Sequence, residues 1–353
     1  MSDKLKLGWV GSGFIGQVAH LSNYIEIPNV DILALAELRP KLGEIACNKY
    51  KIPRYYKDHL ALLNDTDIKA IVAIVRRQHT ASVALDILTR GYHLFTEKPM
   101  APTVDQGQRL VDAAIKNNCI YVTGYMRRHD EGVQKAKQIF DELVKSGELG
   151  DVLYFRAYSF GGNDYCNINS EYTSSDEPPP NNYIWPIAPD WMPTELEKEY
   201  ERFNNTFIHN INLIRYFFKD KPKINHVDYL KESGTVTLNL GKYRGVFEFA
   251  YLQTNRFWQE GLEILFSHGS INLKLPPAFL KNQSATVIIH KDKINQDFEI
   301  IKLKSDWSWS FKRQAESFVK SITSGSESIS SGIDGIEDLR FIENIWRNIV
   351  KNI

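Results

Sequence analysis

The sequence has few cysteines and no excess of either charge. Its three cysteines, Cys47, Cys119 and Cys166, are spread over 353 residues without a Cys-x-x-Cys pair. Such a set indicates neither a disulfide framework nor a cysteine-rich zinc site. The 43 Lys and Arg residues balance the 43 Asp and Glu residues, so the formal net charge is zero. A balanced chain is not expected to bind nucleic acid or a membrane surface through its overall field.

Long apolar runs and metal-binding patterns are also missing. No segment approaches the ~18 apolar residues of a membrane helix, and residues 1–6 lack the apolar core of a signal peptide. No group of His, Cys, Asp and Glu has the spacing of metal ligands, so no metal is expected. These absences predict a reduced, cytoplasmic protein. Its length suffices for two domains, because one domain usually takes about 100–200 residues.

A glycine-rich turn near the start is the clearest motif. Gly11, Gly13 and Gly16 have the spacing G-x-G-x-x-G. The first glycine permits a tight turn, the second lets the backbone approach a pyrophosphate, and the third lets a helix pack closely on a strand. Phe14 and Ile15, between the last two glycines, are expected in the same cofactor site. The helix N-terminus there offers free N–H groups to the phosphates.

The residues around this turn complete a dinucleotide-binding fingerprint. A predicted strand at 5–10 precedes it, a predicted helix at 17–26 follows, and a second strand at 31–36 ends in Glu37. The fingerprint places a carboxylate there to bind the ribose hydroxyls. We therefore predict that the cofactor is NAD and not NADP, because a 2′-phosphate within ~4 Å of Glu37 costs several kcal/mol. Arg39 would weaken that repulsion if it faced the same way.

Strands and helices alternate throughout residues 1–124. Further strands are predicted at 55–56, 70–75, 94–96 and 120–123, and further helices at 40–49, 58–63, 80–89 and 104–117. Repeated β–α units with apolar, β-branched strands indicate a doubly wound parallel sheet. The fold class is therefore α/β, with an N-terminal Rossmann domain over residues 1–124.

The strand at 94–96 ends abruptly in Glu97, Lys98 and Pro99. Pro99 has no N–H and cannot continue a sheet ladder. Glu97 and Lys98 therefore lie at the carboxyl end of a strand, where open α/β sheets bind their ligands. A lysine held there can have its pKa lowered and transfer a proton. An isolated Glu-Lys-Pro is more often a surface ion pair, but the glycine turn at the same sheet edge favours a cofactor site.

Residues 125–353 have the pattern of an α+β domain. Helices are predicted at 130–146, 206–218, 311–322 and 335–350, and strands at 151–160, 224–230, 234–240, 244–253, 262–267, 270–275, 285–290 and 298–303. The close spacing indicates an open-faced, largely antiparallel sheet with one solvated or interface face.

An insertion at about 161–205 interrupts this second domain. It is polar and proline-rich and carries the aromatic residues Tyr165, Tyr172, Tyr183, Trp185 and Trp191. Such long loops are often lids or binding loops. A sugar-binding lid is one interpretation, and an oligomer arm or a packed surface insertion is the other.

Taken together, the motifs resemble those of the Gfo/Idh/MocA oxidoreductases, the relatives of glucose–fructose oxidoreductase and inositol dehydrogenase. They are the glycine fingerprint, Glu97-Lys98-Pro99, Gly124-Tyr125-Met126-Arg127-Arg128-His129-Asp130, Thr206-Phe207-Ile208-His209 and Ser331-Gly332-Ile333-Asp334-Gly335. The resemblance implies that Lys98 lies beside the nicotinamide and the substrate, and that His209 faces it from the second domain. Arg127 and Asn205 would then bind neighbouring substrate groups. The open face of the second sheet would form a homo-oligomer, a dimer or a tetramer.

Two departures from the family pattern bear on the ligand. Family members commonly carry Thr-Pro-Asn-x-x-His after the fourth strand, where this chain has Val75-Arg76-Arg77-Gln78-His79-Thr80. Arg76 and Arg77 either bind a cofactor phosphate or an anionic substrate or lie solvated on a loop. Asn205 and Asn212 stand where inositol-dehydrogenase relatives have aspartates around His209. Asparagine supplies no charge to an imidazolium, so a substrate with a carboxylate or phosphate is one expectation. Altered hydrogen bonding to a neutral sugar is the other.

These patterns predict an NAD-dependent oxidoreductase that acts on a secondary hydroxyl, or the matching ketone, of a sugar, polyol or sugar derivative. The cofactor carries the hydride chemistry, while Lys98 and His209 move the proton. One alternative is a nucleotide-sugar dehydrogenase or ketoreductase of surface-polysaccharide synthesis. Another is a catalytically silent dinucleotide-binding regulatory protein.

Overall fold

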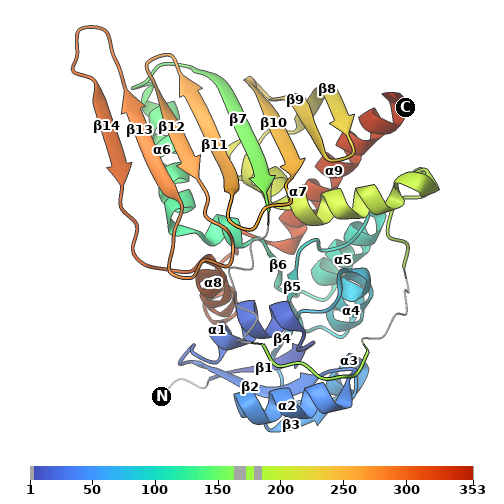
Figure 1. Ribbon diagram of the computed structural model, residues 1–353. Helices are drawn as coiled ribbons and strands as arrows, with labels where there is room; N and C mark the ends of the chain where they lie inside the picture. The colour runs from blue at the N-terminus through green and yellow to red at the C-terminus, as the bar shows by residue number, and fades with distance from the viewer. Residues whose placement is uncertain (1–3, 163–171, 179–184, 353) are drawn as a thin grey trace. The chain divides into compact units, whose positions relative to one another are not determined.

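The computed structural model describes residues 4–162, 172–178 and 185–352, which form two compact units (Figure 1). Unit 1 comprises the described residues of Met1–Tyr125, Asn167–Glu197 and Phe311–Leu339, and unit 2 those of Met126–Cys166, Lys198–Ser310 and Arg340–Ile353. The first change of unit falls one residue from the predicted domain boundary. The structure also assigns two later stretches to unit 1. The predicted roles of the two domains stay predictions.

Unit 1 is built on a six-stranded parallel sheet with the strand order β3-β2-β1-β4-β5-β6. The strands are β1 (Leu5–Val10), β2 (Val30–Ala36), β3 (Arg54–Tyr56), β4 (Ala70–Ala73), β5 (His93–Glu97) and β6 (Tyr121–Gly124). This is the order of a doubly wound dinucleotide-binding sheet. The predicted Rossmann fold is confirmed.

The helices of the parallel sheet follow the predicted order. They are η1 (Gly16–Leu21), α1 (Ser22–Tyr24), α2 (Pro40–Tyr50), α3 (His59–Leu62), α4 (Arg77–Thr89) and α5 (Val104–Lys116). The helix predicted at 17–26 ends at Tyr24 and is wound as a π-helix over η1, a form often found at functional sites. Helix α4 begins three residues earlier than predicted, because the backbone leaves its extended conformation at Arg76.

The core of unit 1 includes a helix from the far end of the chain. Helix α8 (Ser310–Ser324) contributes Phe318, whose ring lies 5.6 Å from that of Phe95 and 6.5 Å from that of Tyr24. Trp9 of β1 packs edge-on against Tyr24 at 5.4 Å. A helix predicted to belong to the second domain therefore completes the core of the first.

Unit 2 contains an eight-stranded sheet with the order β14-β13-β12-β11-β7-β10-β9-β8 (Figure 1). The strands are β7 (Val152–Gly161), β8 (Pro222–Leu230), β9 (Ser233–Leu240), β10 (Tyr243–Tyr251), β11 (Trp258–Phe266), β12 (Gly269–Lys274), β13 (Thr286–Lys291) and β14 (Glu299–Leu303). Only β7 and β10 pair in parallel; the other neighbours are antiparallel. The largely antiparallel sheet is confirmed.

Helices cover one face of this sheet with aromatic side chains. Unit 2 also holds η2 (Met126–His129), α6 (Glu131–Ser146), most of α7 (Glu197–Phe217) and the end of α9 (Gly332–Asn352). Phe207 of α7 packs against Phe249 of β10 at 4.8 Å. The strands also carry an ion pair of 2.7 Å between Arg156 and Glu248, together with the exposed Leu153. The predicted subunit contact stays a prediction.

The insertion is shorter than predicted. The helical turn η4 (Thr194–Leu196) and then α7 begin well before residue 206, so Asn205 lies within a helix and not in a loop. The stretch 194–205 is polar, as loops are, but it is also rich in Glu and other good helix formers, and this helix propensity explains the difference. Trp185 packs under the guanidinium of Arg109 at 4.3 Å, as a packed insertion would. Tyr165 and Tyr183 lie outside the described residues.

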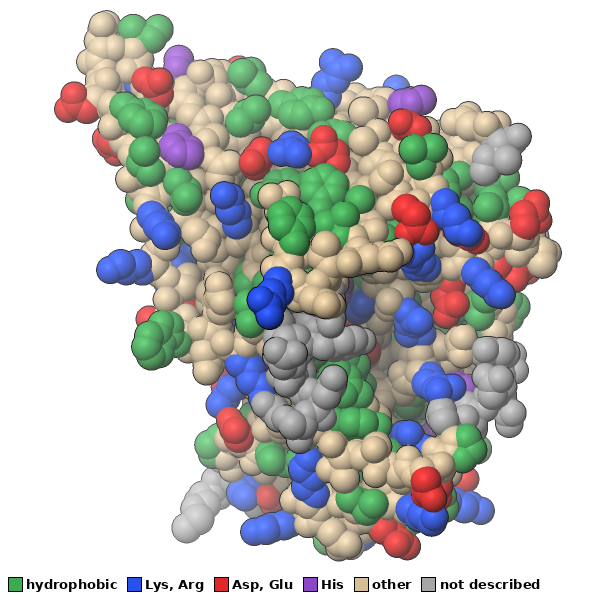
Figure 2. Space-filling model, viewed as in Figure 1, with side chains coloured by type: hydrophobic (Ala, Val, Ile, Leu, Met, Phe, Trp, Pro, Cys, Tyr) green, Lys and Arg blue, Asp and Glu red, His purple; other side chains and the backbone are tan. Residues whose placement is uncertain are grey.

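Charged side chains of both signs are interspersed on the face shown in Figure 2, in keeping with the zero net charge. In the described part of the chain, no helix combines the length and the apolar composition that crossing a membrane requires.

Candidate cofactor and catalytic site

The glycine turn has the geometry of a phosphate cradle. Gly11 has a φ of 89°, and a Cβ there would lie 2.3 Å from the carbonyl oxygen of Ile74. A Cβ on Gly13 would meet nothing within 4 Å, so this side of the turn is open. The side chain of Gln17 donates to the carbonyl of Ser12 at 2.7 Å and fixes the turn from the helix side. An open backbone at Gly13 beside a helix N-terminus fits a pyrophosphate.

Two alanine variants should separate folding from cofactor binding at this turn. Gly11→Ala is expected to weaken both, because the new Cβ collides with backbone and the positive φ costs about 1–2 kcal/mol. Gly13→Ala should leave the melting temperature within about 2 °C, yet weaken NADH binding by roughly tenfold or more, because its Cβ enters the open side. Thermal melts and NADH fluorescence titrations of both variants provide the test. Normal binding by Gly13→Ala would place the phosphates elsewhere.

Glu37 follows β2 and points back to the glycine turn. Its Oε2 accepts hydrogen bonds from the N–H and the hydroxyl of Ser12 at 2.8 and 3.0 Å, and its Oε1 accepts one from Nε of Arg39 at 2.8 Å. Burial would raise the pKa of Glu37, but the bonds from Arg39 and Ser12 outweigh it and hold that pKa below its usual value. A buried carboxylate that stays ionised is suited to accept hydrogen bonds from ribose hydroxyls. Arg39 does face Glu37, as the sequence left open.

Lys98 follows the last residue of β5 and is half-buried. Oε2 of Glu97 accepts the backbone N–H of Lys98 at 3.0 Å, and Oε1 of Glu97 lies 2.8 Å from Nε2 of His20. A Cβ on Gly124 would come within 2.9 Å of Glu97 Oε1, so only glycine leaves room for this carboxylate. Because β1, β4 and β5 are parallel neighbours, Lys98 and Gly11 lie at the same edge of the sheet.

His20 lies beside Glu97, a contact that the sequence motifs do not indicate. The imidazole is fully buried, with the rings of Phe95 and Phe311 each 5.4 Å away. It supports the carboxylate that holds the backbone of Lys98. The available signal was its position four residues after Gly16, because residues at that spacing share a helix face and Gly16 faces the sheet.

Arg76 and Arg77 lie at the N-terminus of α4, directly after β4, and both side chains are exposed. Their position at the ligand-binding edge is compatible with either interpretation made from the sequence, a contact with an anion or solvated charges.

In unit 2, Asn205, His209 and Asn212 share one face of α7, because they are spaced by four and three residues in a continuous helix. Asn205 and His209 are half-buried, and Asn212 is buried. The helix thus presents the predicted histidine between two amides, in the order that the sequence indicated.

Arg127 is buried and its charge is paired within unit 2. The residue is 3% exposed, its Nη1 donates to the carbonyl of Pro276 at 2.8 Å, and its Nη2 forms an ion pair with Glu260. Asn210 donates to the other oxygen of Glu260 at 3.4 Å. The positive charge of Arg127 is therefore balanced by a buried carboxylate. Its predicted contact with substrate stays a prediction.

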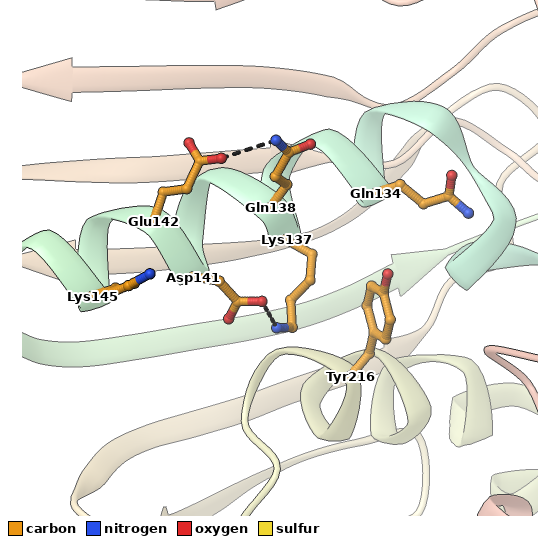
Figure 3. A pocket seen from close by; sticks show the side chains of 7 residues that line it. All are labelled: Gln134, Lys137, Gln138, Asp141, Glu142, Lys145 and Tyr216. Carbon is orange, nitrogen blue, oxygen red and sulfur yellow. Dashed lines mark hydrogen bonds and ion pairs between the residues drawn. The ribbon is translucent and has the colours of Figure 1, made fainter.

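A separate hollow of about 390 Å³ lies beside α6 (Figure 3). It is lined by Gln134, Lys137, Gln138, Asp141, Glu142, Lys145 and Tyr216. Lys137 pairs with Asp141, and Gln138 bonds Glu142 at 2.9 Å, one helical turn apart. None of the predicted site residues lines this hollow, so it is not the candidate site.

Comparisons with known proteins agree with this geometry. Residues 5–125 match a family model described as "Oxidoreductase family, NAD-binding Rossmann fold", which confirms the prediction of NAD as cofactor. Inositol 2-dehydrogenase of Salmonella paratyphi B is 34% identical over 237 residues, which are 66% of this chain and 60% of that relative. The chain thus spans less than two thirds of the length of that relative.

Two solved structures show the same fold at low sequence identity. A putative NADPH-dependent oxidoreductase from Desulfitobacterium hafniense has a TM-score of 0.78 at 13% identity. The match covers 100% of this chain and 97% of that structure. Levoglucosan dehydrogenase in complex with NADH and levoglucosan has a TM-score of 0.76 at 18% identity, with coverage of 99% and 98%. Since the two names carry different dinucleotides, the fold alone does not decide between NAD and NADP.

Proposed function

We propose that the chain belongs to the Gfo/Idh/MocA oxidoreductase family, whose NAD-binding Rossmann model its residues 5–125 match, and that the protein is an NAD-dependent oxidoreductase. It acts on a secondary hydroxyl, or the matching ketone, of a sugar or polyol. The observation that carries this proposal is the arrangement at one edge of the parallel sheet. The open glycine turn, the ionised Glu37 and the fixed backbone of Lys98 all lie there.

The side chains have separable tasks in this proposal. Bound NAD would supply the hydride chemistry. The backbone at Gly13 would hold the pyrophosphate, and Glu37 the ribose. Lys98 would hold or move the proton at the substrate oxygen, with its backbone fixed through Glu97 and His20.

His209 and Asn205 of α7 are proposed to bind the substrate, and His209 to take part in proton transfer. Histidine is suited to this because its ordinary pKa lies near neutral pH. The two residues are one turn apart on one helix face, so they can bind adjacent hydroxyl groups of one ring.

A neutral sugar or polyol is favoured over an anionic substrate. The relative from Salmonella is named for inositol, and a structural neighbour is bound to levoglucosan. In this chain, Glu260 balances the charge of Arg127, which removes one of the positive groups that an anionic substrate would use. These observations support a neutral ring with several hydroxyl groups.

A substrate panel followed by NADH absorbance tests the proposal. We expect neutral polyols and sugars to reduce NAD with a kcat/KM at least about tenfold above that of the matching sugar acids and nucleotide sugars. If NADH binds and no compound in the panel reacts, the protein is a silent dinucleotide-binding protein and the proposal fails.

Asn205→Asp tests the substrate contact in the same assay. A new carboxylate should lower kcat/KM for an anionic sugar by roughly tenfold more than for its neutral counterpart, because like charges in a partly desolvated site repel. Asn225→Asp is the matched control, since Asn225 is exposed on β8 and bonds only Asn239 among the contacts seen there. Equal effects of Asn205→Asp on both sugars would remove Asn205 from the substrate site.

A further inference from the structure

A segment distant in sequence lies against the glycine turn of unit 1. Residues 172–178, here named the strap, are drawn in yellow-green in Figure 1. The ring of Tyr172 packs edge-on against Phe14 at 5.4 Å. The carbonyl of Thr173 accepts from the side-chain amide of Gln17 at 2.7 Å, and the N–H of Thr173 donates back to that amide at 3.3 Å. The glutamine that fixes the glycine turn therefore also fixes the strap.

The far end of the strap occupies the N-terminus of α2. The N–H groups of Lys41 and Leu42 donate to the two carboxylate oxygens of Glu177 at 3.3 and 3.2 Å. The hydroxyl of Ser175 donates to the same carboxylate at 3.1 Å. The N-cap residue of α2, Arg39, makes no capping hydrogen bond with its side chain. Free N–H groups at a helix N-terminus bind anions, and here a carboxylate from outside the helix has that place.

This carboxylate acts on the same arginine as Glu37. Arg39 is both the N-cap residue of α2 and the partner of Glu37. Burial would lower the pKa of Arg39, but its bond to Glu37 and the charges of Glu37, Tyr172 and Glu177 raise it above the usual value. Glu177 is therefore close enough to act on the guanidinium that Glu37 binds, next to the place assigned to the ribose.

We propose that Glu177 is a specificity-determining residue that selects NAD over NADP. Its carboxylate takes the two helix N–H groups beside Glu37 that an additional phosphate on the ribose would need. Arg39, a cation at this helix end, is already engaged by Glu37. A 2′-phosphate would thus find its donors occupied and two like charges in place. Binding sites often reject a competing ligand in this way, by repelling its charge and by leaving its polar groups without partners.

The inference rests on the proposed function only in requiring a nicotinamide dinucleotide in unit 1. The alternative explanation is that Glu177 only caps helix α2. A cap stabilises α2, so its loss would lower the melting temperature and leave the ratio of the NADPH and NADH affinities unchanged. A specificity residue changes that ratio.

The test is a fluorescence titration of NADH and NADPH with Glu177→Gln and Glu177→Ala, beside thermal melts. Glu177→Gln removes the charge and keeps the shape, and Glu177→Ala also frees both N–H groups. We expect NADPH to bind about tenfold more tightly to Glu177→Ala and about threefold more tightly to Glu177→Gln, with NADH within twofold. Asp176→Asn is the matched control: it removes an equal charge whose ion pair, among the described residues, is with the exposed side chain of Lys41, and should leave the ratio unchanged.

Either of two results overturns the inference: an unchanged ratio in both Glu177 variants with NADH binding intact, or a wild-type protein that binds NADPH as tightly as NADH. The proposed function fails differently, by NADH binding without turnover of any substrate. A change in melting temperature without a change in the ratio makes Glu177 a helix cap only.

Discussion

Lys98→Ala is expected to lower kcat by about 10²–10⁴-fold, the usual range for a group that transfers a proton in the transition state. NADH binding and the melting temperature should change little. The reason is local: the contacts that fix this corner of the sheet are made by the backbone N–H of Lys98 and by the side chains of Glu97 and His20. Removing the ammonium group leaves those contacts intact.

Lys98→Arg distinguishes proton transfer from a purely electrostatic role. A guanidinium keeps the positive charge but does not give up its proton at neutral pH. If Lys98 moves a proton, arginine should be nearly as inactive as alanine; if it only supplies charge, arginine should recover much of the rate. Lys116→Ala, an exposed lysine at the end of α5, controls for the loss of a surface charge. Near-native turnover by Lys98→Ala would mean that Lys98 is not catalytic and belongs only to a surface ion pair at the end of a strand.

The parts of this site that could be predicted from the sequence are those set by local rules. Gly11 and Gly13 are required by the backbone of one turn, and the position of Glu37 follows from the length of one β–α–β unit. Lys98 could be placed because a proline stops the strand two residues after Glu97. Each of these signals lies within one β–α–β unit of the feature that it predicts.

The parts that escaped prediction depend on contacts between distant segments. His20 and Glu97 are 77 residues apart, and Glu177 lies 135 residues from Leu42, whose N–H it accepts. Nothing in the composition of α8 shows that Phe318 packs against Phe95 in the first unit and not in the second. The sequence of an amphipathic helix indicates that the helix has an apolar face, but it does not indicate which surface covers that face.

Arg127 is a further case in which a contact with a residue distant in sequence escaped prediction. A motif likeness predicted a substrate contact, and its buried partner Glu260 is 133 residues away. The pair could not be inferred from either residue alone. Breaking this pair is expected to cost much stability, because removal of one partner leaves the other charge buried without compensation.

Arg127→Ala is expected to lower the free energy of unfolding by about 3–5 kcal/mol, the usual cost of removing one partner of a buried ion pair. Glu260, at 4% exposure, would lose its positively charged partner, and the carbonyl of Pro276 would lose the hydrogen bond from Arg127. Urea unfolding followed by tryptophan fluorescence measures the loss. A loss below about 1 kcal/mol would mean that the pair contributes little to the fold.

The double variant Arg127→Met with Glu260→Leu then separates folding from substrate binding. Replacing both charges by apolar side chains of similar size is often neutral for stability, so this variant should unfold within about 1–2 kcal/mol of the wild type. In the folded double variant, a KM within about twofold of the wild-type value would make Arg127 a residue that positions η2 against β11. A KM raised about tenfold or more, with stability retained, would instead mean that Arg127 binds the substrate while Glu260 holds its guanidinium in place.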